Sequence, residues 1–298
     1  MKEKIILPRL FILGTQRSGT TLLTRVLSSH PHFYVQNEGM PVRKIFSSTK
    51  SVDDIRANIN KQFYKIRKSG SINDFLRQKN IDSWGYKDPQ LTEYTDSLDL
   101  IINASKNKTK FVLIVRDARG VVNSYIDNKW GLGTNAYTGA LRWKREVREQ
   151  LSFMEKHSDL FLIIRFEDLL QDMEASIRAV CEHIDLEYAP SMLEYHQKKP
   201  EYKEKRENLN TSKKPDSTIA QKWRKTLSER EINIIEYVAG DELSRLGYEI
   251  SDKHVSVSGL EKFYYLAHQK IIGEIQLQYR WRKASISDFF DKFGNHGR

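Results

Sequence analysis

The chain has 298 residues, of which 39% are hydrophobic and 30% charged, and its formal net charge is +10. It is long enough to bury a substantial core, and no run approaches the roughly 20 apolar residues of a membrane-spanning helix. Its single cysteine, Cys181, excludes an intrachain disulfide and favours a cytoplasmic location. The apolar start of the chain differs from a signal peptide, because Pro8 and Arg9 interrupt it and no small-residue cleavage site follows. The positive charge predicts an anionic partner, which could be nucleic acid, a membrane surface or a small polyanion.

The first distinctive stretch, residues 11–27, reads FILGTQRSGTTLLTRVL. Its apolar start predicts a buried strand, its glycine-bearing middle a turn, and its last eight residues a helix with one apolar face. A strand, a turn and a helix in this order direct backbone N–H groups and the positive end of the helix toward an anion.

The glycines of this turn resemble those of a nucleotide-binding loop. Gly14 and Gly19 keep the spacing of the triphosphate loop G-x-x-x-x-G-K-[ST]. Thr20 and Thr21 replace its Lys-Ser/Thr pair, and Arg17 supplies a cation inside the turn instead. The sequence therefore predicts a phosphate-binding loop that lacks the lysine of ATPases.

The remainder of the chain alternates between predicted strands and helices. Apolar runs predict strands at 33–35, 111–115 and 160–164. Helical spacing predicts helices within 40–80 and at 98–104, 121–126, 137–156, 173–184, 219–226, 228–246 and 260–281. Residues 84–89 are interpreted as a compact turn, and the charge-rich segment 198–215 as a surface loop or lid.

This alternation predicts one α/β domain with a mainly parallel sheet over residues 1–250. Residues 251–298 are expected to form an aromatic and basic helical extension that packs on the same domain or on a second subunit. Packing on a second subunit would make the protein a homodimer. In such sheets ligands bind beyond the carboxyl ends of the strands. The polar side chains expected at that edge are Arg17, Glu38, Arg116 and Arg165.

Two segments about 100 residues apart, GTQRSGTT at 14–21 and VRDARGVVNSYI at 115–126, carry a family resemblance. The first resembles the 5′-phosphosulfate loop, and the second the 3′-phosphate motif, of the sulfotransferases that use 3′-phosphoadenosine 5′-phosphosulfate (PAPS). The chain is most similar to their tyrosylprotein and bacterial branch. Further likenesses are Asn37-Glu38 at the position of the family's glutamate base, a K-D-P turn at 87–89, an [RY]-[YF]-E-D-L segment at 165–169 and, more weakly, a late segment around 217–224.

The resemblance implies a P-loop NTPase-like three-layer fold, with a central, mainly parallel sheet flanked by helices. It implies PAPS as the sulfuryl donor and 3′-phosphoadenosine 5′-phosphate (PAP) as the product. The implied cofactor-binding residues are Arg17, Ser18, Gly19, Thr20 and Thr21 for the 5′-phosphosulfate, Arg116 and Ser124 for the 3′-phosphate, and Ser217, Lys222, Trp223 and Arg224 in the late segment. The implied catalytic residues are Glu38, Lys87 and Arg17.

The two central catalytic candidates also have ordinary structural interpretations. Glu38 suits a general base that accepts the proton of an attacking hydroxyl, but it could also be a solvated glutamate after a strand, since a lone glutamate is common there. Lys87 suits a cation that neutralises charge on the leaving phosphate, but it could instead pair with Asp88.

The donor-binding candidates have alternatives as well. Arg17 could be a surface arginine near a turn, and residues 18–21 an ordinary helix N-cap. Arg116 and Ser124 could belong to a salt bridge at the strand end, with Asp117 or Asp127 as the partner.

The sequence thus predicts a PAPS-dependent sulfotransferase that acts by in-line attack on a hydroxyl or amine of a small metabolite or glycan, with no nucleic-acid partner. No metal is expected, because the chain has no His/Cys cluster with ligand spacing and protein cations can serve a sulfuryl group. Two alternatives stay open. Thr20 and Thr21 argue against a P-loop kinase that uses ATP. The charge and the aromatic and basic residues at 263–265 and 279–283 would suit a non-catalytic binder of nucleic acid or a membrane surface, although such spacing is more typical of a core or subunit face.

Overall fold

The computed structural model describes residues 4–47, 49–68, 70–129, 131–198, 214–251 and 255–294, with side chains as far as residue 282. The chain divides into two compact units. The sheet unit comprises Met1–Arg116 and Glu149–Ala220, and the helical unit comprises Asp117–Arg148 and Gln221–Arg298. The predicted division after residue 250 stays a prediction.

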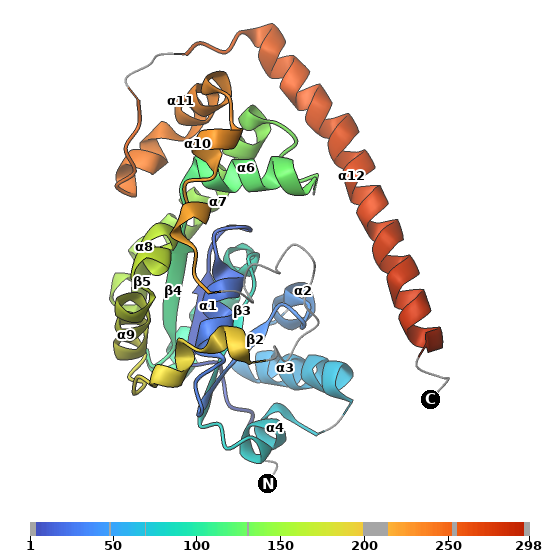
Figure 1. Cartoon of the computed structure of the whole chain (residues 1–298). Coiled ribbons are helices and arrows are strands. Elements are labelled where there is room, and N and C mark those ends of the chain that lie inside the picture. The colour runs from blue at the N-terminus through green and yellow to red at the C-terminus, as the bar shows by residue number, and fades with distance from the viewer. Residues whose placement is uncertain are drawn as a thin grey trace. The chain divides into compact units, whose positions relative to one another are not determined.

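The sheet unit is built on a five-stranded parallel sheet with the strand order β2-β3-β1-β4-β5 (Figure 1). The strands are β1 (Leu10–Leu13), β2 (Phe33–Asn37), β3 (Ser83–Lys87), β4 (Lys110–Val115) and β5 (Phe161–Arg165). All of β1 and all but the first residue of β4 are buried, because strands in the middle of a parallel sheet pack on both faces. The predicted parallel α/β sheet is confirmed.

One face of the sheet packs on helices that follow β1 and β5. Alternate residues of a strand point to opposite faces, so Leu10 and Ile12 share one side. They lie in a buried core with residues of α1 (Thr20–Leu27), α8 (Phe166–Gln171) and α9 (Met173–His183). This core fixes α1, and therefore the turn that precedes it, against the sheet.

The other face of the sheet carries aromatic rings. Phe11, Phe111 and Phe161 stack in series across β1, β4 and β5, with centroid separations of 5.5 and 4.8 Å. Phe153, near the end of α7 (Ala136–Lys156), meets Phe111 edge-on. The remaining helices of this unit are α2 (Val42–Phe46), α3 (Val52–Arg67), α4 (Ile72–Gln78) and α5 (Thr95–Ser105), with short 3-10 turns η1 (Leu91–Tyr94), η2 (Ser158–Leu160), η3 (Pro190–Met192), η4 (Tyr195–Gln197) and η6 (Ser217–Ile219).

The helical unit contains α6 (Ala118–Asn128), the first part of α7, α10 (Trp223–Thr226), α11 (Glu229–Arg245) and the long α12 (Gly259–Gly294). A buried ion network joins α6 to α11. Arg119 donates to Asp117 (2.6 Å) and to Glu236 (2.6 Å), and Glu236 also accepts the backbone N–H of Ser251 (3.0 Å). The side chains of Arg119, Asp117 and Glu236 are each 7% exposed.

Polar side chains hold α12 to the loop before α7. Gln269 accepts the N–H of Thr134 (2.8 Å) and donates to the carbonyl of Gly131 (2.6 Å), whose own N–H donates to Gln276 (2.9 Å). A side chain at Gly131 would collide with Gly273 of α12. The predicted C-terminal helix is therefore confirmed, and it packs within the helical unit through amides.

Two expectations about local structure are wrong. Residues 84–87 are not a turn but belong to β3, in which Trp84 and Tyr86 are buried and Gly85 lies close to the backbone of Leu10. Aromatic residues favour strands, and the glycine between them allows this close approach. Residues 219–226 do not form one helix, because η6 ends at Ile219 and α10 begins at Trp223.

Two further expectations concern loops and membranes. The predicted loop at 198–215 falls mostly on residues 199–213, which lie outside the described part of the chain. Among the helices that the structure describes, none combines the length and the apolar character that a membrane span requires.

Candidate active site

The turn between β1 and α1 is a compact loop with left-handed backbone at two positions. Arg17 has φ of 73° and Gly19 has φ of 101°. Ser18 is buried, and its backbone N–H and its hydroxyl both donate to the carbonyl of Thr15, at 3.2 and 2.7 Å. A Cβ at position 19 would collide with the ring of Phe166, so glycine is required there. The predicted strand, turn and helix are confirmed.

Arg116, directly after β4, contacts this loop. Its guanidinium donates to the carbonyls of Arg17 (3.1 Å) and Ile219 (3.3 Å) and lies 4.5 Å from the ring centre of Phe166. Two predicted donor-binding residues, Arg17 and Arg116, are thus brought together at the ends of neighbouring strands. The contribution of Phe166 was missed in the sequence, where it is visible only as the aromatic position after β5.

A cavity of about 120 Å³ opens at the loop. Five predicted donor-binding residues line it, namely Arg17, Gly19, Thr20, Thr21 and Arg116, and Lys214 adds a third cation. Two guanidinium groups, an ammonium and a helix N-terminus are a suitable donor set for a sulfate or phosphate oxyanion. The volume suits the phosphosulfate end of a nucleotide, so the residues present fit that part of PAPS.

Glu38 and Lys87 meet at the ends of β2 and β3. These strands are parallel neighbours in which Asn37 pairs with Lys87, and the N–H of Glu38 donates to the carbonyl of Lys87 (3.0 Å). The ammonium of Lys87, whose side chain is 1% exposed, forms an ion pair with the carboxylate of Glu38, which is 42% exposed. The partner of Lys87 in this ion pair is therefore Glu38 and not Asp88.

Asp88, considered in the sequence only as an alternative partner of Lys87, is a buried carboxyl beside this pair. It is 7% exposed and accepts the N–H of Gln90 (2.9 Å). Burial raises the pKa of Asp88 from 3.8 to about 6; the charge of Glu38 adds to the rise, while the Gln90 hydrogen bond and the Lys87 charge oppose it.

Asp88→Asn is expected to stabilise the protein at pH 8 and to have little effect at pH 4. A carboxyl whose folded-state pKa is raised contributes most stability below its unfolded pKa and loses that contribution as the pH rises through the folded pKa of about 6. The charged form at pH 8 therefore costs up to about 3 kcal/mol, which the amide avoids while keeping the bond to Gln90. Urea unfolding of both proteins at the two pH values measures this. An equal effect at pH 4 and pH 8 would contradict the raised pKa.

The other predicted donor-binding residues lie as follows. Ser217 is exposed in η6 of the sheet unit. The remaining four belong to the helical unit. Ser124 accepts a hydrogen bond from Asn128 (3.1 Å), and Lys222 forms an ion pair with Asp127 (2.6 Å). Trp223 is buried, and the guanidinium of Arg119 lies 4.3 Å from its ring centre. Arg224 donates a hydrogen bond to Gln221 (2.6 Å). Their roles toward a donor stay predictions.

The described residues contain no group of three or more His, Cys, Asp or Glu side chains that could hold a metal ion. The parallel sheet and the strand-loop-helix unit with its arginines give this α/β protein the P-loop NTPase-like fold. Residues 8–190, more than half of the chain, match the sulfotransferase family. The chain belongs to this family of PAPS-dependent enzymes.

Individual relatives agree with this assignment. The chain is 24% identical over 197 residues to a putative protein-tyrosine sulfotransferase of Caenorhabditis briggsae, covering 63% of this chain and 69% of that protein. It is 24% identical over 206 residues to protein-tyrosine sulfotransferase A of Caenorhabditis elegans, covering 64% of this chain but 53% of that protein. The solved sulfotransferase domain from the curacin biosynthetic pathway shares the fold, with a TM-score of 0.56, 16% identity and coverage of 83% of this chain and 100% of that domain.

Proposed function

We propose that the protein transfers a sulfuryl group from PAPS to a hydroxyl or amine of a small metabolite or glycan. The observation that carries this proposal is that the loop after β1, Arg116 after β4 and the Glu38–Lys87 pair at the ends of β2 and β3 all lie at the carboxyl ends of parallel strands of one sheet. An anion site and a carboxylate base at the same edge of one sheet are the two parts that this transfer requires.

Residues of the loop and Arg116 are assigned to the donor. The backbone N–H groups at the start of α1 and the side chain of Arg17 would hold the 5′-phosphosulfate, as the wall of the small cavity suggests. Arg116, with Ser124 from the helical unit, is assigned to the 3′-phosphate. The late residues Ser217, Lys222, Trp223 and Arg224 keep their assignment to donor binding from the family resemblance.

Glu38 is assigned as the general base. The acceptor oxygen forms a bond to sulfur while the bond from sulfur to the bridging phosphate oxygen breaks, and the acceptor proton passes to the carboxylate of Glu38. Lys87 is buried beside Glu38, and its positive charge together with that of Arg17 would stabilise charge on the leaving phosphate. Sulfotransferase chemistry of this kind uses protein cations, so no metal is assigned.

The proposal is tested by incubating the protein with PAPS, a panel of alcohols, phenols, amines and glycans, and a metal chelator, and following PAP and the sulfated product. Formation of PAP that depends on both an acceptor and the protein is expected. Hydrolysis of ATP, or phosphoryl transfer from ATP, in the presence of magnesium, together with no sulfuryl transfer from PAPS, would favour the kinase alternative instead. The cytoplasmic location and a homodimer stay predictions.

A further inference from the structure

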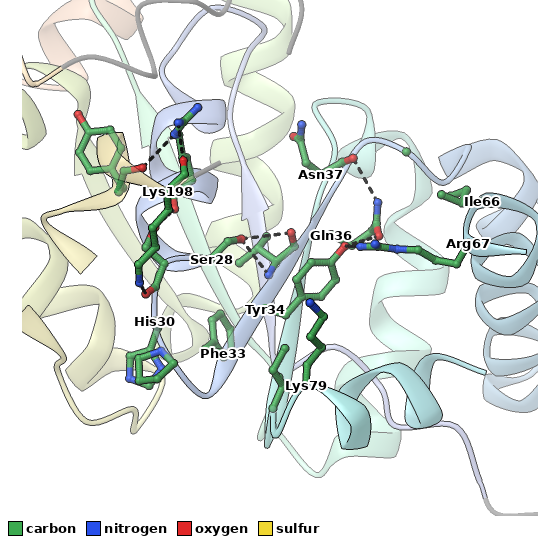
Figure 2. A pocket seen from close by; sticks show the side chains of 17 residues that line it. Ser28, His30, Phe33, Tyr34, Gln36, Asn37, Ile66, Arg67, Lys79 and Lys198 are labelled. Atoms are coloured by element: carbon green, nitrogen blue, oxygen red, sulfur yellow. Dashed lines mark hydrogen bonds between the residues drawn. The ribbon is translucent and has the colours of Figure 1, made fainter. Parts of the chain in front are cut away.

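A second cavity, of about 560 Å³, lies beside β2 (Figure 2). Several polar groups along its walls bond to one another. The hydroxyl of Tyr34 donates to Gln36 (2.7 Å), and Gln36 donates to the carbonyl of Asn37 (3.3 Å). Lys198 likewise donates to the carbonyl of Ser29 (2.6 Å). These contacts hold the chain around β2, and the clearest sign of a binding partner lies elsewhere, on α12.

One side of α12 packs within the helical unit. Tyr265 of α12 stacks on Tyr137 of α7, with the ring centroids 5.8 Å apart. Three further residues of α12 contact the loop before α7, namely Gln269, Gly273 and Gln276. These four residues recur at intervals of three or four, so they form one side of the helix.

The opposite side of α12 carries exposed apolar side chains. Leu260, Tyr264, Ile271 and Ile275 recur at intervals of four or seven residues and form a stripe along this side. Their exposed fractions lie between 59% and 83%. A helix normally turns such a stripe toward a core, so this stripe, which we call the outer face of α12, indicates an interaction surface.

One edge of the outer face has a symmetric order of residues. It consists of Phe263, Lys270, Glu274 and Trp281, at intervals of seven, four and seven residues. Lys270 and Glu274 are exposed, and neither forms an ion pair with a described residue. Both lie two positions from residue 272, whereas Phe263 and Trp281 both lie nine positions from it. The sequence of this edge is therefore complementary to itself when its direction is reversed.

This symmetry suits two α12 helices, from two copies of the chain, that pack antiparallel about a two-fold axis at residue 272. Such an axis brings the same edge of both helices together and opposes residues that lie equally far from it. Lys270 then faces Glu274 of the second copy, and Phe263 faces Trp281 of the second copy. Each contact occurs twice, and opposite charges and paired aromatic rings both stabilise an interface.

The apolar surface of α12 is also large enough for a dimer. Four aromatic rings on and beside the outer face are 62% to 72% exposed, namely those of Phe263, Tyr264, Tyr279 and Trp281. At roughly 150–250 Å² for each ring, they leave on the order of 500 Å² uncovered. With the three aliphatic side chains of the stripe, this area approaches the roughly 800 Å² that each partner buries in a stable interface.

An anionic partner suits the outer face less well than a second copy does. The exposed charges on it and beside it are of both signs, namely Lys270, Glu274 and Arg282. A helix that binds a membrane surface has a polar side rich in lysine and arginine, and nucleic acid likewise selects cations. Glu274 would repel the phosphates of either partner, whereas in the dimer it pairs with a lysine.

We propose that the outer face of α12 is the interface of a homodimer, in which the two α12 helices pack antiparallel and cross at residue 272. This inference goes beyond the proposed function and does not depend on it, because the contacts that carry it lie on α12 and not at the carboxyl ends of the strands.

Sedimentation equilibrium of the full chain without nucleotide tests the dimer. The wild type is expected to reach twice the 35.0 kDa mass of the chain at micromolar concentration. Ile271→Glu places a charge at the centre of the face in both copies, so association is expected to weaken about 100-fold, about tenfold for each copy. Ile250→Glu changes an exposed isoleucine of the same unit outside α12 and is expected to leave the dimer intact.

Charge exchange tests the antiparallel register. Lys270→Glu and Glu274→Lys each place like charges opposite one another across the axis, and each is expected to weaken association about tenfold. A mixture of the two variants is expected to recover the association of the wild type, because every lysine then faces a glutamate. A mixture that associates no better than either variant alone would contradict the register.

Three other results would overturn the inference. The first is a wild type that stays monomeric up to millimolar concentration, with the outer face bare or covered within the same chain. The second is a dimer that Ile271→Glu leaves unchanged, which would place the interface elsewhere. The third is a monomer that binds phosphatidylserine vesicles or a DNA duplex and loses this binding in Ile271→Glu. Circular dichroism checks that each variant is folded, and Ile275→Glu serves if Ile271→Glu is not.

Discussion

Glu38→Gln is expected to lower kcat by about 10²- to 10⁴-fold, the contribution of a positioned general base. Glutamine keeps the size of the side chain and an oxygen that can accept from Lys87, but it cannot take the acceptor proton. Affinity for PAP, measured by calorimetry, is expected to stay close to that of the wild type, since the loop and Arg116 are untouched. The loss should therefore appear in kcat of PAP release and not in donor binding.

A matched control is Glu93→Gln, an exposed glutamate in η1. It removes one carboxylate from the same unit without touching Lys87, and kcat is expected to be unchanged. If Glu38→Gln retained full turnover, the proton would have to pass to another group and the assignment of the base would be wrong.

Arg119→Met is expected to cost about 3–5 kcal/mol in the free energy of unfolding, because it leaves two buried carboxylates without their cation. Arg119 makes bonds to Asp117 and Glu236 at 2.6 Å each, and all three side chains are 7% exposed. Its guanidinium also lies over Trp223, so packing is lost as well. Urea unfolding of the intact chain, followed by circular dichroism, measures the change.

Arg230→Met serves as the control in the same unit. Arg230 pairs with Glu261 at the surface, where solvent screens the charges, so a far smaller loss is expected. A loss for Arg119→Met within about 1 kcal/mol, the range of a surface ion pair, would show that the buried network does not hold α6 to α11.

The donor side of the site could be predicted from the sequence because its parts are local. The strand, turn and helix around Arg17 are consecutive, and Arg116 follows an apolar run that reads as a buried strand. Local patterns of this kind also identified β2, β5 and the helices α5, α6, α7 and α9. Neither β3 nor α8 was identified: residues 84–89 were interpreted as a turn, although Trp84 and Tyr86 pack as strand residues.

Long-range pairings could not be predicted. Glu38 and Lys87 are 49 positions apart, and only the register of β2 with β3 brings them into contact. Arg119 and Glu236 are 117 positions apart, so the buried network has no local pattern. The pKa of Asp88 depends on burial that a K-D-P motif does not show.

The proposed function requires that the loop and Arg116 bind a 3′-phosphorylated adenine nucleotide. Calorimetric titration of the wild type and of Arg116→Ala with PAP, in the absence of metal, tests it most directly. Binding by the wild type that is lost by a folded Arg116→Ala protein is the predicted result. No binding by a folded wild type would contradict the sulfotransferase account, and binding of ATP with magnesium in its place would identify a kinase.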